Sequence, residues 1–189
     1  MPRSARMALP FLTALALAAC SSPPPPPAAP PPPPPPAAEA PQPPPGPPTA
    51  TSDQDFVNQA MAMNASEIGM GRLARSKATT RPIRTLAERM VSGHTHANQQ
   101  LAALAKRLHI TAAPPPDQPP PELLTSTGPE FDRQYVGLVI KAHRDMIALF
   151  ESEANGGGDP RAKRWARGML PELRHHLREA EAIGHRLGV

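Results

Sequence analysis

The chain has 189 residues and a formal charge of +4, but Arg3 and Arg6 lie in a segment that we expect to be cleaved, which leaves +2. Only 3% of the residues are aromatic, so neither charge nor base-stacking side chains favour nucleic acid as a partner. Cys20 is the only cysteine, which excludes an internal disulfide and a cysteine-rich metal site.

Residues 1–19 have the features of a signal peptide. Two arginines precede an apolar run that is too short to span a bilayer as a mature helix. The run ends in "LAAC", which resembles the bacterial lipobox and predicts lipid attachment at Cys20; an ordinary signal peptide cut near Ala19 is the alternative. The residue after the cysteine is Ser21. An aspartate at this position favours retention in the inner membrane of enterobacteria, so the serine favours the outer membrane. We therefore expect a lipoprotein on the periplasmic side of the outer membrane, anchored there by its acyl chains.

Residues 20–52 form a proline-rich tether. From Pro23 to Pro48, 18 of 26 residues are proline. Proline fixes φ and lacks a backbone donor, so this segment cannot join a helix or sheet and should be disordered or extended as polyproline II. At about 3.1 Å per residue it can reach roughly 80 Å. A spacer toward the cell wall is the simpler interpretation, and a ligand for an aromatic groove is the alternative.

Residues 53–189 have apolar side chains at spacings of three and four, the pattern of amphipathic helices. Proline, glycine and capping residues divide the segment into four predicted helices, which are 53–78, 82–109, 129–154 and 160–187. A proline-rich crossover joins the second helix to the third, and "NGGGDP" makes a tight turn before the fourth. If the helices alternate in direction, the fold is all-α, an antiparallel four-helix bundle.

Four polar residues lie on or beside the inward faces of these helices, one on each: Glu67, His94, His143 and His176. Counting residues from the expected turns places all four at a similar depth. Three imidazoles and a carboxylate at one depth are suitable first ligands for a divalent metal such as zinc, iron or copper. Alternatively, the same residues hydrogen-bond to one another across the core and only fix the packing of the helices.

No motif in the chain indicates an enzyme. "NGGGDP" lacks the lysine and the preceding strand of a phosphate-binding loop, and nothing resembles a nucleophile elbow or a catalytic triad. We therefore expect no catalytic residues.

Three segments of the chain resemble one bacterial family: "SEIGMGRLARSKATTRPIRTLAERMVSGHTHANQQL", "FDRQYVGLVIKAHRDMIALFE" and "LPELRHHL". This is the domain-of-unknown-function 4142 family, whose members are described as exported or outer-membrane proteins. The landmarks are Glu67-Ile68, His94, Phe131-Asp132, His143 and Pro171-x-Leu173-x-x-His176. The resemblance implies a ferritin-like bundle over nearly all of the folded part and implies no activity.

The chain differs in two ways from patterns seen in similar sequences and in di-iron bundles, and both differences bear on whether it binds a metal. Similar sequences commonly have Asp-His where this chain has Gly93-His94. Di-iron bundles use Glu-x-x-His on two helices, whereas this chain has a single one at Glu172 and His175. A ferroxidase of that type is therefore not expected.

Two hypotheses for function follow. In the first, a lipid-anchored periplasmic ferritin-like domain binds a metal through Glu67, His94, His143 and His176 and has a stress or metal-handling role. In the second, the domain is a non-catalytic module that binds a cell-wall component or an envelope protein, for example through the basic face of its last helix.

Overall fold

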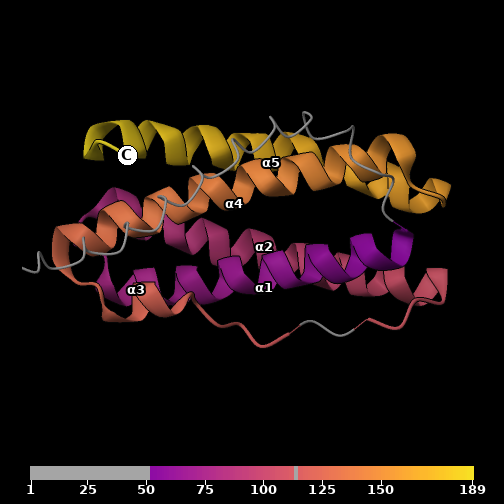
Figure 1. Ribbon diagram of the computed structural model, residues 1–189, viewed down its shortest axis with the longest axis horizontal. Helices are drawn as coiled ribbons and strands as arrows, with labels where there is room; N and C mark the ends of the chain where they lie inside the picture. The colour runs from indigo at the N-terminus through magenta and orange to yellow at the C-terminus, as the bar shows by residue number, and fades with distance from the viewer. Residues whose placement is uncertain (1–51, 113–114) are drawn as a thin grey trace, which may run out of the picture. The chain divides into compact units, whose positions relative to one another are not determined.

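The computed structural model describes residues 52–112 and 115–189, and the chain forms five helices and no strand within these ranges (Figure 1). The helices are α1 (Asp53–Lys77), α2 (Arg81–Leu108), α3 (Pro121–Thr125), α4 (Gly128–Gly156) and α5 (Pro160–Leu187). The prediction of an all-α fold is confirmed, and the ends of the four long helices lie within two residues of the expected ones. The short α3 was not expected.

Several sequence predictions fall outside the described residues. These are the signal peptide 1–19, the lipid attachment site Cys20, and the tether up to residue 51. Among the helices within the described ranges, none combines the length and the apolar character that crossing a bilayer requires.

The long helices begin and end at residues suited to those positions. The Ser52 hydroxyl accepts the backbone N–H of Asp55 at 3.2 Å and caps α1. Asp159 accepts the N–H of Arg161 at 2.7 Å and caps α5, which Pro160 opens. At the end of α2, His109 adopts a left-handed conformation with φ of 56°.

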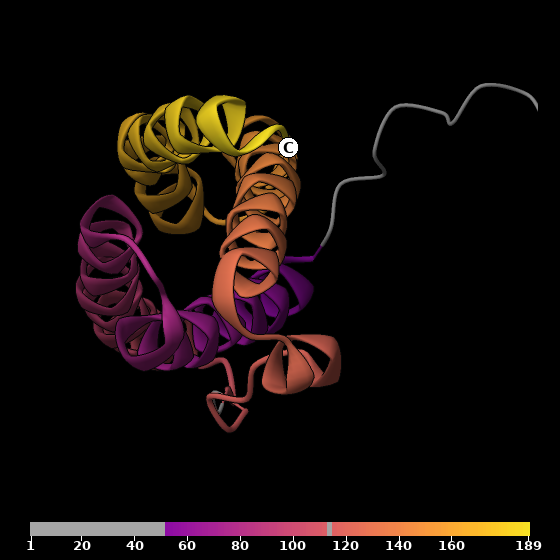
Figure 2. The same cartoon turned by 90° about the vertical axis from the view of Figure 1, so that its left-hand side faces the viewer.

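The four long helices form two hairpins that face each other (Figure 2). The most extensive contacts are within the hairpins, α1 with α2 and α4 with α5. Between the hairpins, α1 contacts α4 more extensively than α2 contacts α5. The α2–α5 side of the bundle is therefore the less tightly closed one.

The sequence had suggested that the helices alternate in direction along the chain. In the structure they do not. Thr79, in the turn between α1 and α2, donates its backbone N–H at 3.0 Å to Asp132 at the start of α4. At the opposite end, Arg161 at the start of α5 donates at 3.0 Å to the carbonyl of Arg107 at the end of α2. Helices α2 and α4 therefore run in the same direction, while every pair of adjacent helices remains antiparallel (Figure 1).

Residues 115–127, which lead into α4, return along the bundle beside α1, and this explains the unexpected direction of α4 (Figure 1). They lie so close to α1 that a Cβ at Gly69 would come within 2.9 Å of the backbone of Asp117. Lys77 donates to the carbonyls of Leu124 and Ser126 at 2.6 and 3.0 Å. These contacts, with the buried Leu123, hold the crossover against the bundle.

A layer of polar side chains divides the apolar core into two clusters. One cluster lies toward the turn between α1 and α2 and includes Leu86, Met90, Phe131 and Val139. The other lies toward the turn between α4 and α5 and includes Phe56, Leu101, Met146 and Phe150. The buried polar side chains between them are Asn64, Glu67, His94, His143 and His176. This layer contains every metal ligand expected from the sequence.

Candidate metal centre

His94, His143 and His176 converge at the centre of the bundle. Their ring centroids are 5.3 to 5.8 Å apart, and one ring nitrogen from each lies within 4.8 Å of the others. The residues are 2%, 0% and 7% exposed, respectively. Three imidazoles from three helices thus surround one small, water-poor volume.

These residues meet because each lies near the middle of its helix. His94 is the fourteenth of 28 residues in α2, His143 the sixteenth of 29 in α4, and His176 the seventeenth of 28 in α5. A residue near the middle of a helix has nearly the same height whichever way the helix runs. The expectation of a common depth therefore survives although the assumed direction of α4 was wrong.

His94 is oriented by two asparagines. Its Nδ1 lies 2.9 Å from Oδ1 of Asn64, and Nδ2 of Asn64 donates to Oδ1 of Asn98 at 2.9 Å. Since the Asn64 oxygen accepts, Nδ1 of His94 carries the proton. The lone pair of His94 is then on Nε2, which is buried and has no hydrogen-bond partner.

His143 is oriented by its own helix. Its Nδ1 donates to the carbonyl of Val139 at 2.9 Å, which leaves the lone pair on Nε2. That Nε2 is also buried without a partner. Glu67 approaches the same Nδ1, with its Oε1 at 3.8 Å.

His176 has a different arrangement. Its Nδ1 is buried without a partner, whereas its Nε2 lies 3.9 Å from Oε1 of Glu172, one turn earlier on α5. This separation exceeds a hydrogen bond. The Glu172 side chain is about half exposed, at 49%.

The three imidazoles are held in their neutral form. Burial, followed by the nearby His143 and His176, lowers the pKa of His94 well below its usual value. Burial is also the main cause that lowers the pKa of His143 to about 4 and that of His176 to about 4. Neutral imidazoles have lone pairs available at pH 7, the state that metal binding requires.

Glu67 is not part of the group of converging ligand atoms. It is fully buried, and neither carboxylate oxygen has a hydrogen-bond partner. Burial raises the pKa of Glu67 to about 8, so it carries a proton at neutral pH. Of the four ligands expected from the sequence, the structure therefore brings three together and places the fourth behind His143.

Sequence reasoning missed Asn64 and Asn98, and it grouped Glu172 with His175 where the structure places it beside His176. Asn64 lies three residues before Glu67, Asn98 four residues after His94, and Glu172 four residues before His176, so each shares a helix face with an expected ligand. That spacing was the available signal. His96, which pairs with Gln100 at 2.8 Å, is exposed and lies outside the site.

A cavity of about 10 Å³ adjoins the histidines. This volume accommodates about one water molecule. Two of the histidines, His94 and His176, line it together with polar and apolar residues that include Gly93, Phe150, Met169 and Glu172.

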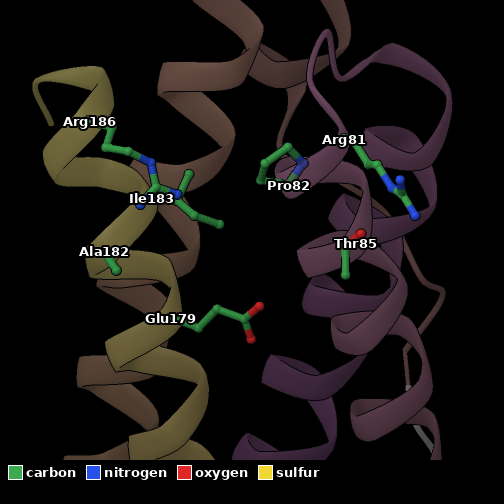
Figure 3. A pocket seen from close by; sticks show the side chains of 7 residues that line it. All are labelled: Arg81, Pro82, Thr85, Glu179, Ala182, Ile183 and Arg186. Carbon is green, nitrogen blue, oxygen red and sulfur yellow. The ribbon is translucent and has the colours of Figure 1, made fainter.

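A larger groove of about 350 Å³ lies between the start of α2 and the end of α5 (Figure 3). Arg81 and Arg186 flank it, and Glu179 extends into it from α5 (Figure 3). Glu179 is paired with Arg89 at 2.8 Å. Among the described residues, none of the buried side-chain atoms without a partner belongs to the lining of this groove. The groove therefore does not compete with the histidine layer as a metal site.

Comparison with known proteins places the chain in a family and identifies structures with a similar fold. The family described as "Domain of unknown function (DUF4142)" matches residues 37–183. No curated protein is significantly similar.

Among solved structures, a DUF305 fragment from Deinococcus radiodurans has a TM-score of 0.62 and 21% identity, over 74% of this chain and 99% of that one. CopM in a Cu(II)-bound form has a TM-score of 0.62 and 14% identity, over 72% and 98%. CopM soaked with silver has a TM-score of 0.61 and 15% identity, over 71% and 95%. At these identities the likeness concerns the fold.

Proposed function

Because this chain belongs to the DUF4142 family, whose description assigns no activity, we propose its function from the site: it binds one metal ion through His94, His143 and His176. The observation that carries the proposal is the convergence of three ring nitrogens within 4.8 Å, together with three buried imidazole nitrogens that have no partner. Leaving such atoms unpaired costs stability, and a metal ion satisfies all three at once.

The partners of the outer ring nitrogens support this proposal. A histidine that binds a metal usually donates its other N–H to a carbonyl or carboxylate, which fixes the tautomer and the ring orientation. Asn64 accepts from His94, and the Val139 carbonyl accepts from His143. A set of histidines that only fixed the packing would be expected to hydrogen-bond to one another instead.

Copper is the metal that we propose. Neutral imidazole suits copper, zinc and iron, so the histidines alone do not select among them. Met169, whose thioether favours Cu(I), lines the adjoining cavity. The similarly folded CopM has been obtained with Cu(I), Cu(II) and silver. We assign Glu67 to the support of His143 rather than to the metal, and we assign the protein a role in metal handling or stress rather than in catalysis.

The test is the metal content of the domain, residues 52–189, purified without a histidine tag. We expect about one copper ion per chain after loading and desalting, measured by elemental analysis. The matched control is His96→Ala, which removes an exposed histidine of the same helix as His94 and should leave the metal content unchanged. A wild-type protein that retains no copper, zinc or iron would contradict the proposal and would favour a non-catalytic module that binds a cell-wall or envelope partner.

We also propose that the domain acts in the bacterial envelope as a lipoprotein anchored through Cys20, with residues 20–52 as its tether. The support is the "LAAC" sequence after the apolar run. A Cys20→Ser protein is expected to leave the membrane fraction and appear in the soluble periplasmic extract, as followed by fractionation and immunoblotting. Membrane retention equal to that of the wild type would refute the anchor.

A further inference from the structure

The histidine layer is closed on most sides by the bundle itself. His143 is fully buried and is backed by the equally buried Glu67. Apolar clusters cover the layer above and below along the helices. His176 is the most exposed of the three histidines, at 7%. An ion that reaches the layer must therefore come from the side of His176, between α2 and α5.

Gly93 lies on α2 at this point, immediately before His94. A Cβ at residue 93 would come within 3.2 Å of Cε1 of His176 and 3.3 Å of Oε1 of Glu172. Both distances are shorter than ordinary van der Waals contact. Glycine therefore leaves a gap where any other residue would press against the imidazole ring and the carboxylate.

Glu172 lies at the outer edge of this gap. It is the only carboxylate among the residues that line the adjoining cavity. Its side chain is about half exposed, and its Oε1 is 3.9 Å from Nε2 of His176. The carboxylate is thus in contact with solvent on one side and with the histidine layer on the other.

A positive charge near the gap makes the carboxylate of Glu172 more important for an incoming cation. Arg89 places such a charge near His176, and its ion pair with Glu179 offsets that charge. Without Glu172, a cation approaching the gap would meet no negative charge among the residues that line it.

Resting on the proposed metal site, we infer that Glu172 receives the cation from solvent and delivers it to the histidines through the gap that Gly93 leaves between α2 and α5. Glu172 is an entry residue in this scheme, while the three histidines set the affinity. Its removal should slow both association and dissociation and should change the equilibrium affinity much less. A residue that merely supports the fold would not produce this pattern.

The test measures the rate of Cu²⁺ binding by stopped-flow fluorescence. Trp165 is the only tryptophan, and its ring centroid is 5.5 Å from that of Phe150, which lines the cavity, so it should report the arrival of the quenching ion. At low ionic strength we expect Glu172→Gln to slow association about tenfold. Gly93→Ala, which narrows the gap without removing the carboxylate, should slow association by a similar factor.

Two variants serve as matched controls. Glu181→Gln removes another carboxylate from α5, and Gly168→Ala adds a methyl group to α5 where nothing lies within 4 Å. Both should associate with Cu²⁺ within about twofold of the wild-type rate. Circular dichroism checks that all four variants are folded.

The outcomes separate the entry route from the site. If the wild type binds one Cu²⁺ and both Glu172→Gln and Gly93→Ala associate at the wild-type rate, the entry route is wrong and the site stands. If Glu172→Gln loses affinity without a change in association rate, Glu172 supports His176 and is not an entry residue. If the wild type binds no metal, the proposed function itself fails.

Discussion

Replacing His143 by leucine should abolish the stabilisation of the protein by copper and leave the metal-free protein at least as stable as the wild type. His143 is fully buried, its Nε2 has no partner, and its pKa is lowered to about 4, mainly by burial. Burying a polar atom without a partner costs about 1 to 3 kcal/mol, which a leucine of similar volume does not incur. The buried imidazole thus has a cost in the absence of metal.

With copper bound, we expect the wild type to be more stable than His143→Leu. A ligand that binds only the folded state raises the free energy of unfolding by about 2.7 kcal/mol when its concentration is 100 times its dissociation constant. Losing one of three protein ligands should weaken binding by more than about 100-fold. The wild type should therefore gain stability from copper, and His143→Leu should gain almost none.

Urea denaturation with copper and with a chelator measures both effects. Met146→Leu is the matched control, because it changes another fully buried residue of α4 and leaves the histidines intact. It should retain the copper-dependent gain. If the metal-free His143→Leu protein instead loses several kcal/mol, the three histidines stabilise the core as a hydrogen-bonded set, and the metal interpretation loses its basis.

A second large effect, on the pH dependence of stability, is expected from Glu153. This residue lies at the end of the bundle where α4 turns into α5. Glu153 is fully buried, and neither of its carboxylate oxygens has a partner. Its pKa is raised to about 7, first by burial and then by the neighbouring Asp53, with Asp159 adding to the rise and Lys163 opposing it. Asp53 itself accepts the backbone N–H groups of Gly158 and Asp159 at 2.9 Å.

The sign of the pH dependence follows from the raised pKa. Below the ordinary carboxyl pKa of 4.5, Glu153 is protonated in both the folded and the unfolded chain, and its contribution to stability is fully present. Between pH 4.5 and about 7, the unfolded chain loses the proton first, so the free energy of unfolding falls by up to about 1.4 kcal/mol per pH unit. Above pH 7 the loss is complete and amounts to about 3 kcal/mol.

Glu153→Gln should therefore match the wild type near pH 4 and exceed its stability by about 3 kcal/mol at pH 8. The difference between the two proteins is the useful quantity, because the buried histidines change the pH dependence of both equally. Chemical denaturation across this range measures it. Glu151→Gln, two residues away and paired with Arg174 at the surface, should differ from the wild type by less than about 1 kcal/mol throughout. A Glu153→Gln difference that does not vary with pH would contradict the assignment.

Apolar periodicity and capping residues were sufficient to predict the four long helices, because these signals are local. The N-terminal caps Ser52 and Asp159 each act within the first turn of a helix, and so do Pro82 and Pro160. The direction of α4 is not local. It depends on whether residues 109–127 form a hairpin or return along the bundle, and the close contact at Gly69 that fixes the return is visible only in three dimensions.

The candidate site was predictable to a similar extent. His94, His143 and His176 lie on inward faces at mid-helix, so their meeting follows from helix geometry alone. The position of Glu67 behind His143 depends on side-chain direction, which spacing does not reveal. The same holds for Glu172, whose carboxylate lies 3.3 Å from the place where a Cβ at residue 93 would be.

The split core has a further consequence for the register of the four helices. A helix that slid by one turn, about 5.4 Å, would carry its histidine or its Glu67 into an apolar cluster and bring an apolar side chain into the polar layer. A slide of α1 against α2 would also break the hydrogen bond between Asn64 and His94 and leave both groups buried without that partner, which costs free energy. In the apolar clusters alone, alanine, leucine and methionine are similar enough that a slid helix would still bury them. The polar layer therefore selects one alignment among several that the apolar side chains alone would tolerate, much as a single buried asparagine does in a coiled coil.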